Sequence, residues 1–532
     1  MRTDPPILLF ENDGRHPLIY MYEPPIQVEE YQSAVDELAG TPVDALMFCL
    51  GDGRTMLHDT QVGELWGHNV EQWPHLIFRR AHQNAAQLIG EGHDPLHLIC
   101  QRARQVGKAV YPQLLVQVPR GSREEDCRCS DFRFDNPHLE IGAKGGVDPN
   151  WAGFTCLDFA HEEVRSERLA LVREVCEGYD IAGFELQLNY HPYYFHPEEV
   201  AEGTALMTAW IAQVSAIVRD SAPGRALVVR VPARLSSALS AGLDVQAWLR
   251  DGLVDALVGD AFATPENVDC NLDVGELVAA ADGTACRVYA AVHALVDSDR
   301  LGQATIEMIR ACASNAWQQG VDGLYLAHWF GLWPYEASFY QTLRELPYPE
   351  VMAPKNKIYA VPTATQRYPV PRSEPGQRAV LPADLCVGAS AVVPLRIADQ
   401  LPRWGAVGRV DEVLLRLRVM NATERDALRF FLNGVELPAA QRRTINEMYR
   451  MSAPRYRTGS GYWFVFRLDG DTWPVCGDNA VTVELVERDS AVAPPIFLRD
   501  VELEVRYLMG RHFHRAFVDS DLGPYGEKGE RP

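Results

Sequence analysis

Short apolar runs alternate with longer amphipathic stretches over residues 1 to about 350. The apolar runs have the length of strands, and the stretches between them repeat apolar residues every three or four positions, as helices do that bury one face. The predicted helices include 76–92, 162–179, 201–220 and 302–320. The predicted strands are 43–50, 108–117, 181–188, 226–233, 254–262, 286–294 and 321–330, with one earlier strand at 7–12 or 17–23.

This order of strand and helix predicts the fold class of the first part of the chain. Strands that alternate with helices form a parallel sheet, and about eight such units in this length suit a closed barrel better than an open sheet. No GxGxxG or GxxxxGK[ST] motif follows a strand, which disfavours a nucleotide-binding sheet. We therefore predict an α/β fold, a (β/α)8 TIM-type barrel over residues 1–350.

The pattern changes after a proline-rich segment, which we place at 351–378 and interpret as a linker. From 379 to 512 apolar and polar residues alternate in twos, which is typical of an antiparallel β-sandwich. The phrase FLNGVELP contains Asn-Gly between apolar flanks and predicts a β-hairpin. Residues 513–532 are interpreted as a C-terminal tail. The sandwich strands are expected at 389–398, 411–420, 462–469, 480–488 and 500–508.

Composition and charge narrow the classes of partner. The 532 residues are 47 % apolar and 23 % charged, as in ordinary globular proteins, and the net charge of −22 disfavours binding to nucleic acid. No run of 18 apolar residues and no secretory signal occurs, so we expect no membrane partner and a cytoplasmic protein, or a periplasmic or secreted one if a leader was removed. The odd number of 11 scattered cysteines favours reduced thiols. The sequence leaves open whether the chain forms a homo-oligomer.

Active sites of such barrels lie at the C-terminal ends of the strands. Polar and aromatic residues follow the predicted strands there, and we expect the substrate-binding residues among them. These candidates are Asp13, Asp52, His68, Gln117, Arg133, His161, Gln187, Asn189, His191, Arg230, His293, His328 and Trp329. These candidate histidines form no HxH or HExxH motif, and the pair Cys127-x-Cys129 has no second pair, so neither a metal ion nor another cofactor is expected.

The fourth predicted strand and the residues after it, GFELQLNYHPYYF, carry the strongest functional signal. Because side chains alternate along a strand, Glu185, Gln187 and Asn189 share one face. Polar residues inside a barrel are costly unless they are hydrogen-bonded or solvated. One interpretation is a satisfied network that only orders the barrel. The other is a sugar pocket, because the aromatic residues that follow suit the apolar faces of sugars.

Hydrolysis of a glycoside normally needs two carboxyl groups. Glu185 is the main catalytic candidate, and Asp260, at the end of the sixth predicted strand, is the best partner. Asp260 is also explained as a helix cap or loop residue. The seventh predicted strand ends in AAVHA, so the glutamate of a typical retaining barrel is missing there.

Residues 5 to 340 resemble uncharacterised bacterial proteins described as glycoside-hydrolase-like, which are common in bacteria that degrade polysaccharides. The phrases that carry the resemblance include VDALMFCLGDG, RCSDFRFDNPHLEIG, LDFAHEEVR and YDIAGFELQLNYHPYYF. The resemblance implies a barrel that acts on carbohydrate, without naming the sugar. Glu185 and His191-Pro192 match the pattern expected of the family. Gln187 stands where an Asp is expected, and Ala182 replaces the Asp expected before Gly183.

Three functions are compatible with these observations. The first is a glycoside hydrolase that acts on an oligosaccharide or glycoside and uses Glu185 with Asp260. The second is a carbohydrate-binding protein without catalysis, because the amide of Gln187 cannot transfer a proton usefully near neutral pH. The third is a sugar lyase or isomerase on the same barrel.

Overall fold

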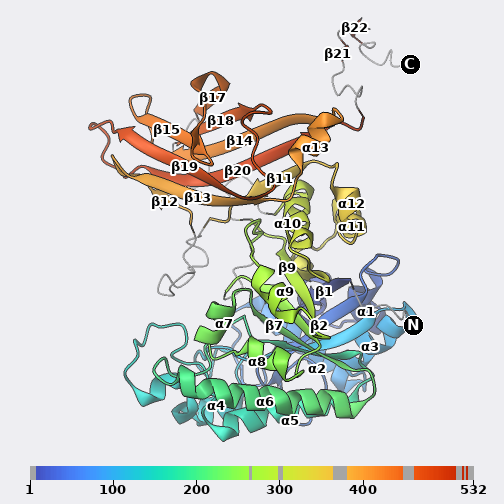
Figure 1. Cartoon of the computed structure of the whole chain (residues 1–532). Coiled ribbons are helices and arrows are strands. Elements are labelled where there is room, and N and C mark those ends of the chain that lie inside the picture. The colour runs from blue at the N-terminus through green and yellow to red at the C-terminus, as the bar shows by residue number, and fades with distance from the viewer. Residues whose placement is uncertain are drawn as a thin grey trace. The chain divides into compact units, whose positions relative to one another are not determined.

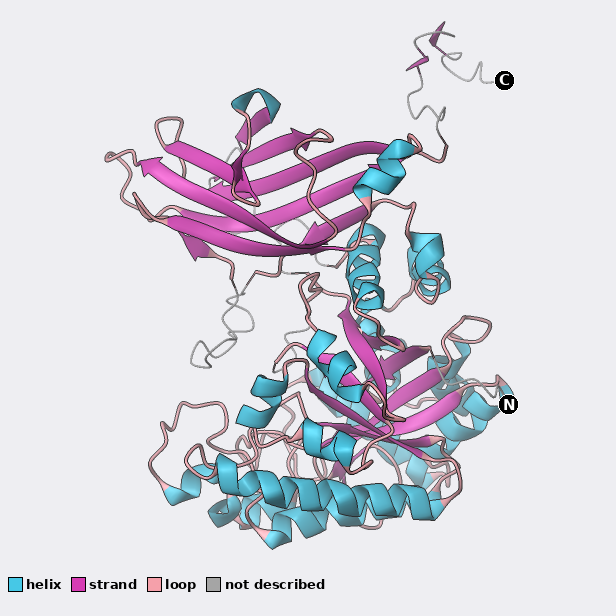
Figure 2. Ribbon diagram, in the orientation of Figure 1, coloured by secondary structure: helices cyan, strands magenta, loops and turns pink. Residues whose placement is uncertain are grey.

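A computed structural model describes residues 7–262, 267–296, 303–363, 380–446 and 461–510, with two short strands at 518–519 and 523–524. The described residues form two compact units. The first contains the described residues up to 304 together with 316–347, and the second contains 305–315, 348–363 and the described residues from 380 onward. Figure 1 labels many of the elements of both units, and Figure 2 colours them by secondary structure.

The first unit is a closed barrel of eight parallel strands. Strand β1 pairs with β10 on one side and with β2 on the other, which closes the ring β1-β10-β9-β8-β7-β6-β5-β2. The predicted α/β barrel is confirmed, and its first strand is the one at 7–12. Residues 17–21 form a short helical turn, η1 (Pro17–Met21), instead. The barrel strands are β1 (Leu8–Asn12), β2 (Ala45–Asp52), β5 (Ala109–Leu115), β6 (Gly183–Gln187), β7 (Ala226–Pro232), β8 (Ala256–Asp260), β9 (Arg287–His293) and β10 (Gly323–Ala327).

Helices connect successive barrel strands. The four predicted helices are present as α2 (Leu76–Gly90), α5 (Glu162–Gly178), α6 (Val200–Ser221) and α10 (Ile306–Gln318). Capping residues in the sequence fix where other helices begin. Helix α3, for example, begins after Asp94, whose carboxylate accepts from the Leu96 and His97 amides, and carries a proline at its first position. The other helices of the first unit are α1 (Val28–Asp36), α3 (Pro95–Gln105), α4 (Asp131–Asp135), α7 (Leu235–Ser240), α8 (Val245–Arg250), α9 (Gly275–Ala281) and, after the last barrel strand, α11 (Ala337–Glu345). Helices α12 (Pro349–Met352) and α13 (Leu401–Ala406) belong to the second unit.

Helix α6 is, by length and composition, apolar enough to cross a membrane. In this structure it packs against α5, α8 and β7, and Figure 1 shows α5 and α6 side by side along the barrel. Its buried residues include Met207, Trp210 and Val214, which recur every three or four positions and face the barrel.

Wide rings on two strands fill the N-terminal end of the barrel. Tyr111 of β5 and Tyr289 of β9 pack over Gly183 and Gly323, the first residues of the neighbouring strands β6 and β10. A Cβ atom at Gly183 would lie 2.5 Å from the Tyr111 ring, and one at Gly323 would lie 2.6 Å from the Tyr289 ring. Apolar packing closes this end, so the polar side chains of the interior lie further along the strands.

The second unit contains two antiparallel sheets that pack on one another, which confirms the predicted β-sandwich. One sheet has the order β11-β20-β14-β18-β17 with β12 beside β20, and the other has the order β13-β19-β15-β16. Phe430 of β15 packs on Phe464 and Phe466 of β18, so the apolar faces of the two sheets meet. The strands are β11 (Lys357–Ala360), β12 (Ala383–Asp384), β13 (Ser390–Ile397), β14 (Val410–Met420), β15 (Ala427–Leu432), β16 (Val435–Glu436), β17 (Arg442–Asn446), β18 (Gly461–Leu468), β19 (Gly477–Glu487) and β20 (Phe497–Tyr507).

Part of the segment predicted as a linker belongs to this sandwich. Strand β11 pairs with β20, and buried Lys357 donates to the Asp399 carboxylate at 2.9 Å. Two tyrosine hydroxyls, of Tyr359 and Tyr507, also donate to Asp399, each at 2.7 Å. These bonds hold β11 in the sheet. Residues 364–378 of the predicted linker lie outside the described residues, as does most of the predicted tail at 513–532.

The predicted Asn-Gly hairpin joins β15 to β16. Asn433 and Gly434 have φ values of 53° and 79°, the left-handed conformation that a two-residue hairpin turn requires. We expect Gly434→Ala to lower the free energy of unfolding of the sandwich by about 1 kcal/mol, because alanine avoids this conformation while no heavy atom lies within 4 Å of the added Cβ. Chemical denaturation measures the change. Gly470→Ala is the matched control, since its surroundings are equally open and no positive φ is recorded there; an equal loss in both variants contradicts the prediction.

Candidate functional site

Seven polar side chains from seven strands meet inside the barrel, beyond the tyrosines that fill its N-terminal end. Each lies on the inward face of its strand, and each is at most 5 % exposed. Burial at this level costs free energy unless every charge and hydrogen-bonding group finds a partner. The members of this polar network are Glu11 of β1, Gln113 of β5, Glu185 of β6, Arg230 of β7, Asp260 of β8, His293 of β9 and Tyr325 of β10.

Arg230 is the centre of the polar network. Its guanidinium donates to Asp260 Oδ2 from Nε at 3.0 Å and from Nη2 at 2.7 Å, and to Glu11 Oε1 from Nη1 at 2.9 Å. The guanidinium carbon also lies 4.8 Å from the centre of the Tyr325 ring. One fully buried cation therefore balances two buried carboxylates that come from opposite parts of the chain.

Glu185 lies beside this charged group without a cation of its own. The Tyr325 hydroxyl is 3.0 Å from both carboxyl oxygens of Glu185, and Gln113 Nε2 donates to that hydroxyl at 2.8 Å and to Glu11 Oε1 at 3.1 Å. Burial and then the negative charge of Glu11 raise the pKa of Glu185 to about 8, against the smaller effect of Arg230. Glu185 is therefore protonated at neutral pH.

The pKa of Asp260 is shifted in the opposite direction from that of Glu185. Burial acts to raise its pKa, but His293 and Arg230, through charge and hydrogen bonds, hold the pKa of Asp260 well below its usual range. His293 Nε2 lies 2.9 Å from Oδ1, which also accepts from the Ala261 amide at 2.7 Å. Asp260 is therefore a fixed anion, while Glu185 retains its proton.

The structure places three of the other predicted site residues against the polar network or beside it. The His328 amide donates to Glu11 Oε2 at 3.0 Å, and the His328 ring stacks on His293 with centres 5.7 Å apart. Gln187 Oε1 accepts from the Asn189 amide at 2.8 Å, and Asn189 Nδ2 donates to the Ala261 carbonyl at 2.5 Å. The ends of β6 and β8 are thus joined just beyond Glu185 and Asp260.

Three predicted residues use their polar atoms to hold loops in place. Gln117 Nε2 donates to the carbonyls of Leu157 and Tyr193, and Trp329 Nε1 donates to the carbonyl of Val292. The Arg133 guanidinium donates to the carbonyls of two loop residues, at positions 118 and 155. These three side chains are at most 2 % exposed, so they support the loops at the C-terminal end of the barrel from within.

Of the other predicted residues, Asp52 ends strand β2 and the rest lie in those loops. Asp52 accepts from Arg15 at 2.9 Å and from the Trp66 indole at 3.0 Å, while Asp13 accepts from the His16 amide at 2.7 Å. His191 is half-buried, and burial, followed by the charge of Arg128, lowers its pKa to about 4. His161 immediately precedes α5. His68 faces two carboxylates, Glu64 and Asp131.

Glu11, Gln113 and Tyr325 were not among the site residues predicted from the sequence. Glu11 and Tyr325 follow the alternation of their strands, since Leu9 and Glu11 share one face and Gly323 and Tyr325 share another. The signal was therefore present in the sequence. It could not be used for Glu11 while the first strand had two candidate positions, and a tyrosine or glutamine alone does not mark chemistry.

Comparisons with known proteins give no family assignment. No family model matches the sequence, and no curated protein matches it. Similar solved structures include a cycloisomaltooligosaccharide glucanotransferase of Paenibacillus sp. (10 % identity, 93 % of this chain and 57 % of that chain, TM-score 0.36) and the GH36 α-galactosidase AgaA of Geobacillus stearothermophilus (12 %, 95 % and 56 %, TM-score 0.38). The PgaB glycoside hydrolase domain of Bordetella bronchiseptica is a third (13 %, 64 % and 98 %, TM-score 0.39).

This chain spans about half the length of the first two of these structures. The TM-scores of these three structures are all below 0.5, so the similarities carry no conclusion about function. The architecture that the sequence predicts, a (β/α)8 barrel followed by an antiparallel β-domain, is the one that the structure has.

Proposed function

We propose that the barrel unit is a carbohydrate-active enzyme, and more closely a glycoside hydrolase in which Glu185 is the general acid and Asp260 the catalytic anion. The opposite displacement of the two pKa values carries the proposal. Two carboxyl groups whose surroundings separate their pKa values in this way provide one proton donor and one anion at the same pH. That combination is what cleavage of a glycosidic bond requires.

The proposed reaction uses water and leaves the protein unchanged. Glu185 donates its proton to the glycosidic oxygen as the bond from that oxygen to the anomeric carbon breaks. The Asp260 carboxylate stabilises the positive charge that develops at the anomeric carbon. Water then supplies the hydroxyl group to that carbon and returns a proton to Glu185.

The rest of the polar network prepares the two carboxyl groups for these roles. The charge of Glu11 helps to keep Glu185 protonated, and Arg230 with His293 keeps Asp260 ionised. We assign Gln187, Asn189, His191, His293 and His328 to substrate binding, because they lie at or just after the C-terminal ends of the strands that carry the network.

Aromatic rings beyond β6 suit a sugar. Tyr190 packs edge-on against His191 with ring centres 4.6 Å apart, and Tyr193 packs edge-on against Trp151 at 5.1 Å. Trp151 and Tyr190 are half-buried, so part of each ring is open to a ligand. Apolar ring faces beside hydrogen-bonding groups match the C–H faces and hydroxyls of a carbohydrate.

The test is incubation of the full chain with a panel of nitrophenyl glycosides and oligosaccharides, followed by product analysis. We expect release of a sugar from at least one member of the panel, at a rate that falls as the pH rises above about 8, because Glu185 then loses the proton that it must donate. An Asp260→Asn variant serves as the inactive reference. Release at the same rate from that variant removes Asp260 from the proposed mechanism.

A second function, sugar binding without catalysis, is favoured by two observations. Glu185 and Asp260 are both fully buried, and Gln187 provides an amide where the related pattern has an acid. Calorimetry with the same oligosaccharides separates the two functions. Binding without any product over several days favours a binding protein, whereas any released sugar excludes it.

A further inference from the structure

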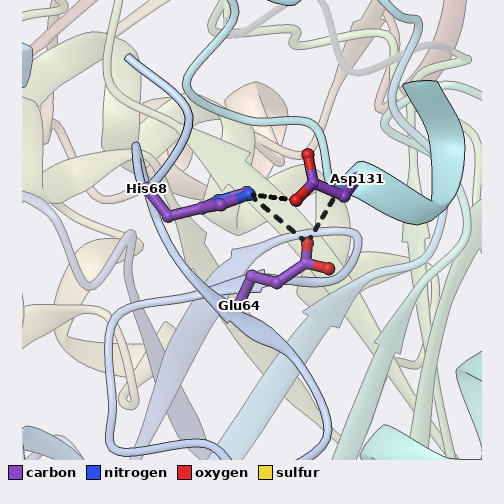
Figure 3. Close-up of side chains that lie close together, drawn as sticks. All are labelled: Glu64, His68 and Asp131. Carbon is purple, nitrogen blue, oxygen red and sulfur yellow. Dashed lines mark hydrogen bonds and ion pairs between the residues drawn. The ribbon is translucent and has the colours of Figure 1, made fainter. Parts of the chain in front are cut away.

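A histidine and two carboxylates converge outside the polar network, in loops of the barrel unit. Glu64 begins the short strand β4 (Glu64–Leu65), His68 follows it, and Asp131 begins α4. Their nearest ligand atoms all lie within 4.8 Å of one another. His68 Nε2 is 3.4 Å from Asp131 Oδ2 and 4.0 Å from Glu64 Oε2, and Figure 3 shows the three side chains pointing toward one another.

Neighbouring groups hold the two carboxylates in this orientation. Arg123 Nη1 donates to the other oxygen of Asp131, Oδ1, at 2.9 Å. Arg54 Nε lies 3.9 Å from the other oxygen of Glu64, Oε1. The Asp131 amide donates to Glu64 Oε2 at 3.1 Å and fixes that oxygen near His68. Each carboxylate thus turns one oxygen toward an arginine and one toward the imidazole, as metal-binding carboxylates held by outer hydrogen bonds do.

We propose that Glu64, His68 and Asp131 bind a divalent transition-metal ion, with Zn²⁺ as the ion that the ligand set fits best. One imidazole nitrogen and two carboxylate oxygens are ligands that zinc accepts, with water in the fourth position. Ligand atoms about 2 Å from a tetrahedral ion are roughly 3.3 Å apart. The distance from His68 to Asp131 already has this value, and Glu64 Oε2 has to approach His68 by roughly 0.7 Å.

The three ligands come from two connections of the barrel. Glu64 and His68 lie between β2 and α2, whereas Asp131 lies between β5 and α5. A bound ion would therefore tie together the connections that follow the second and third barrel strands. The side chains of Glu64 and His68 are 24 % and 23 % exposed, and that of Asp131 is 46 % exposed, so an ion can enter from solvent.

The experiment is equilibrium dialysis of the untagged full chain against Zn²⁺, followed by elemental analysis. We expect one equivalent of Zn²⁺ to be bound and His68→Gln to lower the affinity at least 10-fold. Mn²⁺ is expected to bind more weakly and Mg²⁺ weakest, because imidazole favours the later transition metals. A thermal melt provides a second measurement, in which Zn²⁺ raises the Tm of the wild type by more than that of His68→Gln.

His97→Gln is the matched control. His97 also faces a carboxylate, with Nδ1 3.3 Å from Asp94 Oδ2, but among the described residues it is not part of a group of three such ligands. This variant is expected to bind Zn²⁺ like the wild type. If His68→Gln fails to fold, Asp131→Asn replaces it. The proposal is overturned if the wild type binds no Zn²⁺ at a free concentration of about 0.1 mM, which would be a weak site. It is also overturned if the wild type and the ligand variants bind Zn²⁺ equally.

Discussion

Replacing Glu185 by glutamine is expected to lower the turnover of any glycoside that the wild type cleaves at least about 100-fold. Glutamine has nearly the same shape and keeps an oxygen that can accept from the Tyr325 hydroxyl, which lies 3.0 Å from the carboxyl group in the wild type. It has no proton of suitable acidity to give to a leaving oxygen. The loss should therefore appear in kcat while the barrel stays folded.

The same variant should change how stability depends on pH. Glu185 has a pKa of about 8 in the folded barrel, against 4.5 for a solvated glutamate. Its contribution is thus fully present below about pH 4.5 and is lost as the pH rises toward 8, because the unfolded chain ionises first. Glu185→Gln lacks this ionisation. We expect its stability relative to the wild type to increase by about 1 kcal/mol per pH unit across that window.

Thermal melts of both proteins between pH 4.5 and 8 measure this effect without any substrate. Glu202→Gln, at an exposed position on α6, is the matched control and should leave both turnover and the pH profile unchanged. Wild-type turnover in Glu185→Gln excludes Glu185 as the acid. A parallel pH dependence of the two melts contradicts the raised pKa, whatever the substrate.

Replacing Arg230 by methionine is expected to lower the free energy of unfolding of the barrel by about 3–5 kcal/mol. Methionine fills much of the same volume, but it leaves Glu11 and Asp260 buried without the cation that both of them bind. An uncompensated buried charge is more costly than the loss of the ion pair itself. Chemical denaturation of the full chain measures the difference.

Arg219→Met is the matched control for this substitution. Arg219 pairs with Asp255 at 2.9 Å, but both side chains are more than one-third exposed, so its removal should cost at most about 1 kcal/mol. Adding Asp260→Asn to Arg230→Met should restore part of the stability, because one of the two stranded charges is then removed. Equal losses in the two arginine variants, or no recovery in the double variant, contradict the role given to Arg230.

The period of the apolar pattern was sufficient to predict the barrel and the sandwich. Strand-length apolar runs separated by helices of period 3.6 are compatible with few folds, all with a parallel sheet. The alternation in twos after residue 379 is compatible with few folds as well, and these have antiparallel sheets. Only the structure shows which segment forms the first strand of the barrel. Residues 7–12 and 17–23 are both short and apolar, and only pairing with β2 and β10 at once selects β1. Closure of a ring joins the two ends of the domain, which no local pattern encodes.

Some residues of the candidate site could likewise be predicted from the sequence, and others could not. The alternation GFELQLN placed Glu185 on the inner face of its strand, and Asp260 was found at a strand end. The partners of Glu185 were not found, because Tyr325 is 140 positions away in the sequence and Glu11 is still more distant. Contacts of such range depend on how strands are ordered around the barrel.

The sequence by itself determined which strand faces are polar, and therefore that charged groups would have to be buried together inside the barrel. Only the tertiary structure decided their states of ionisation. Arg230 and His293 contact Asp260, whereas Glu185 contacts the hydroxyl of Tyr325 and is subject to the negative charge of Glu11. A pKa is set by burial and by charges within a few ångströms. In this barrel those charges come from other strands, so two acids of similar sequence context acquire opposite roles.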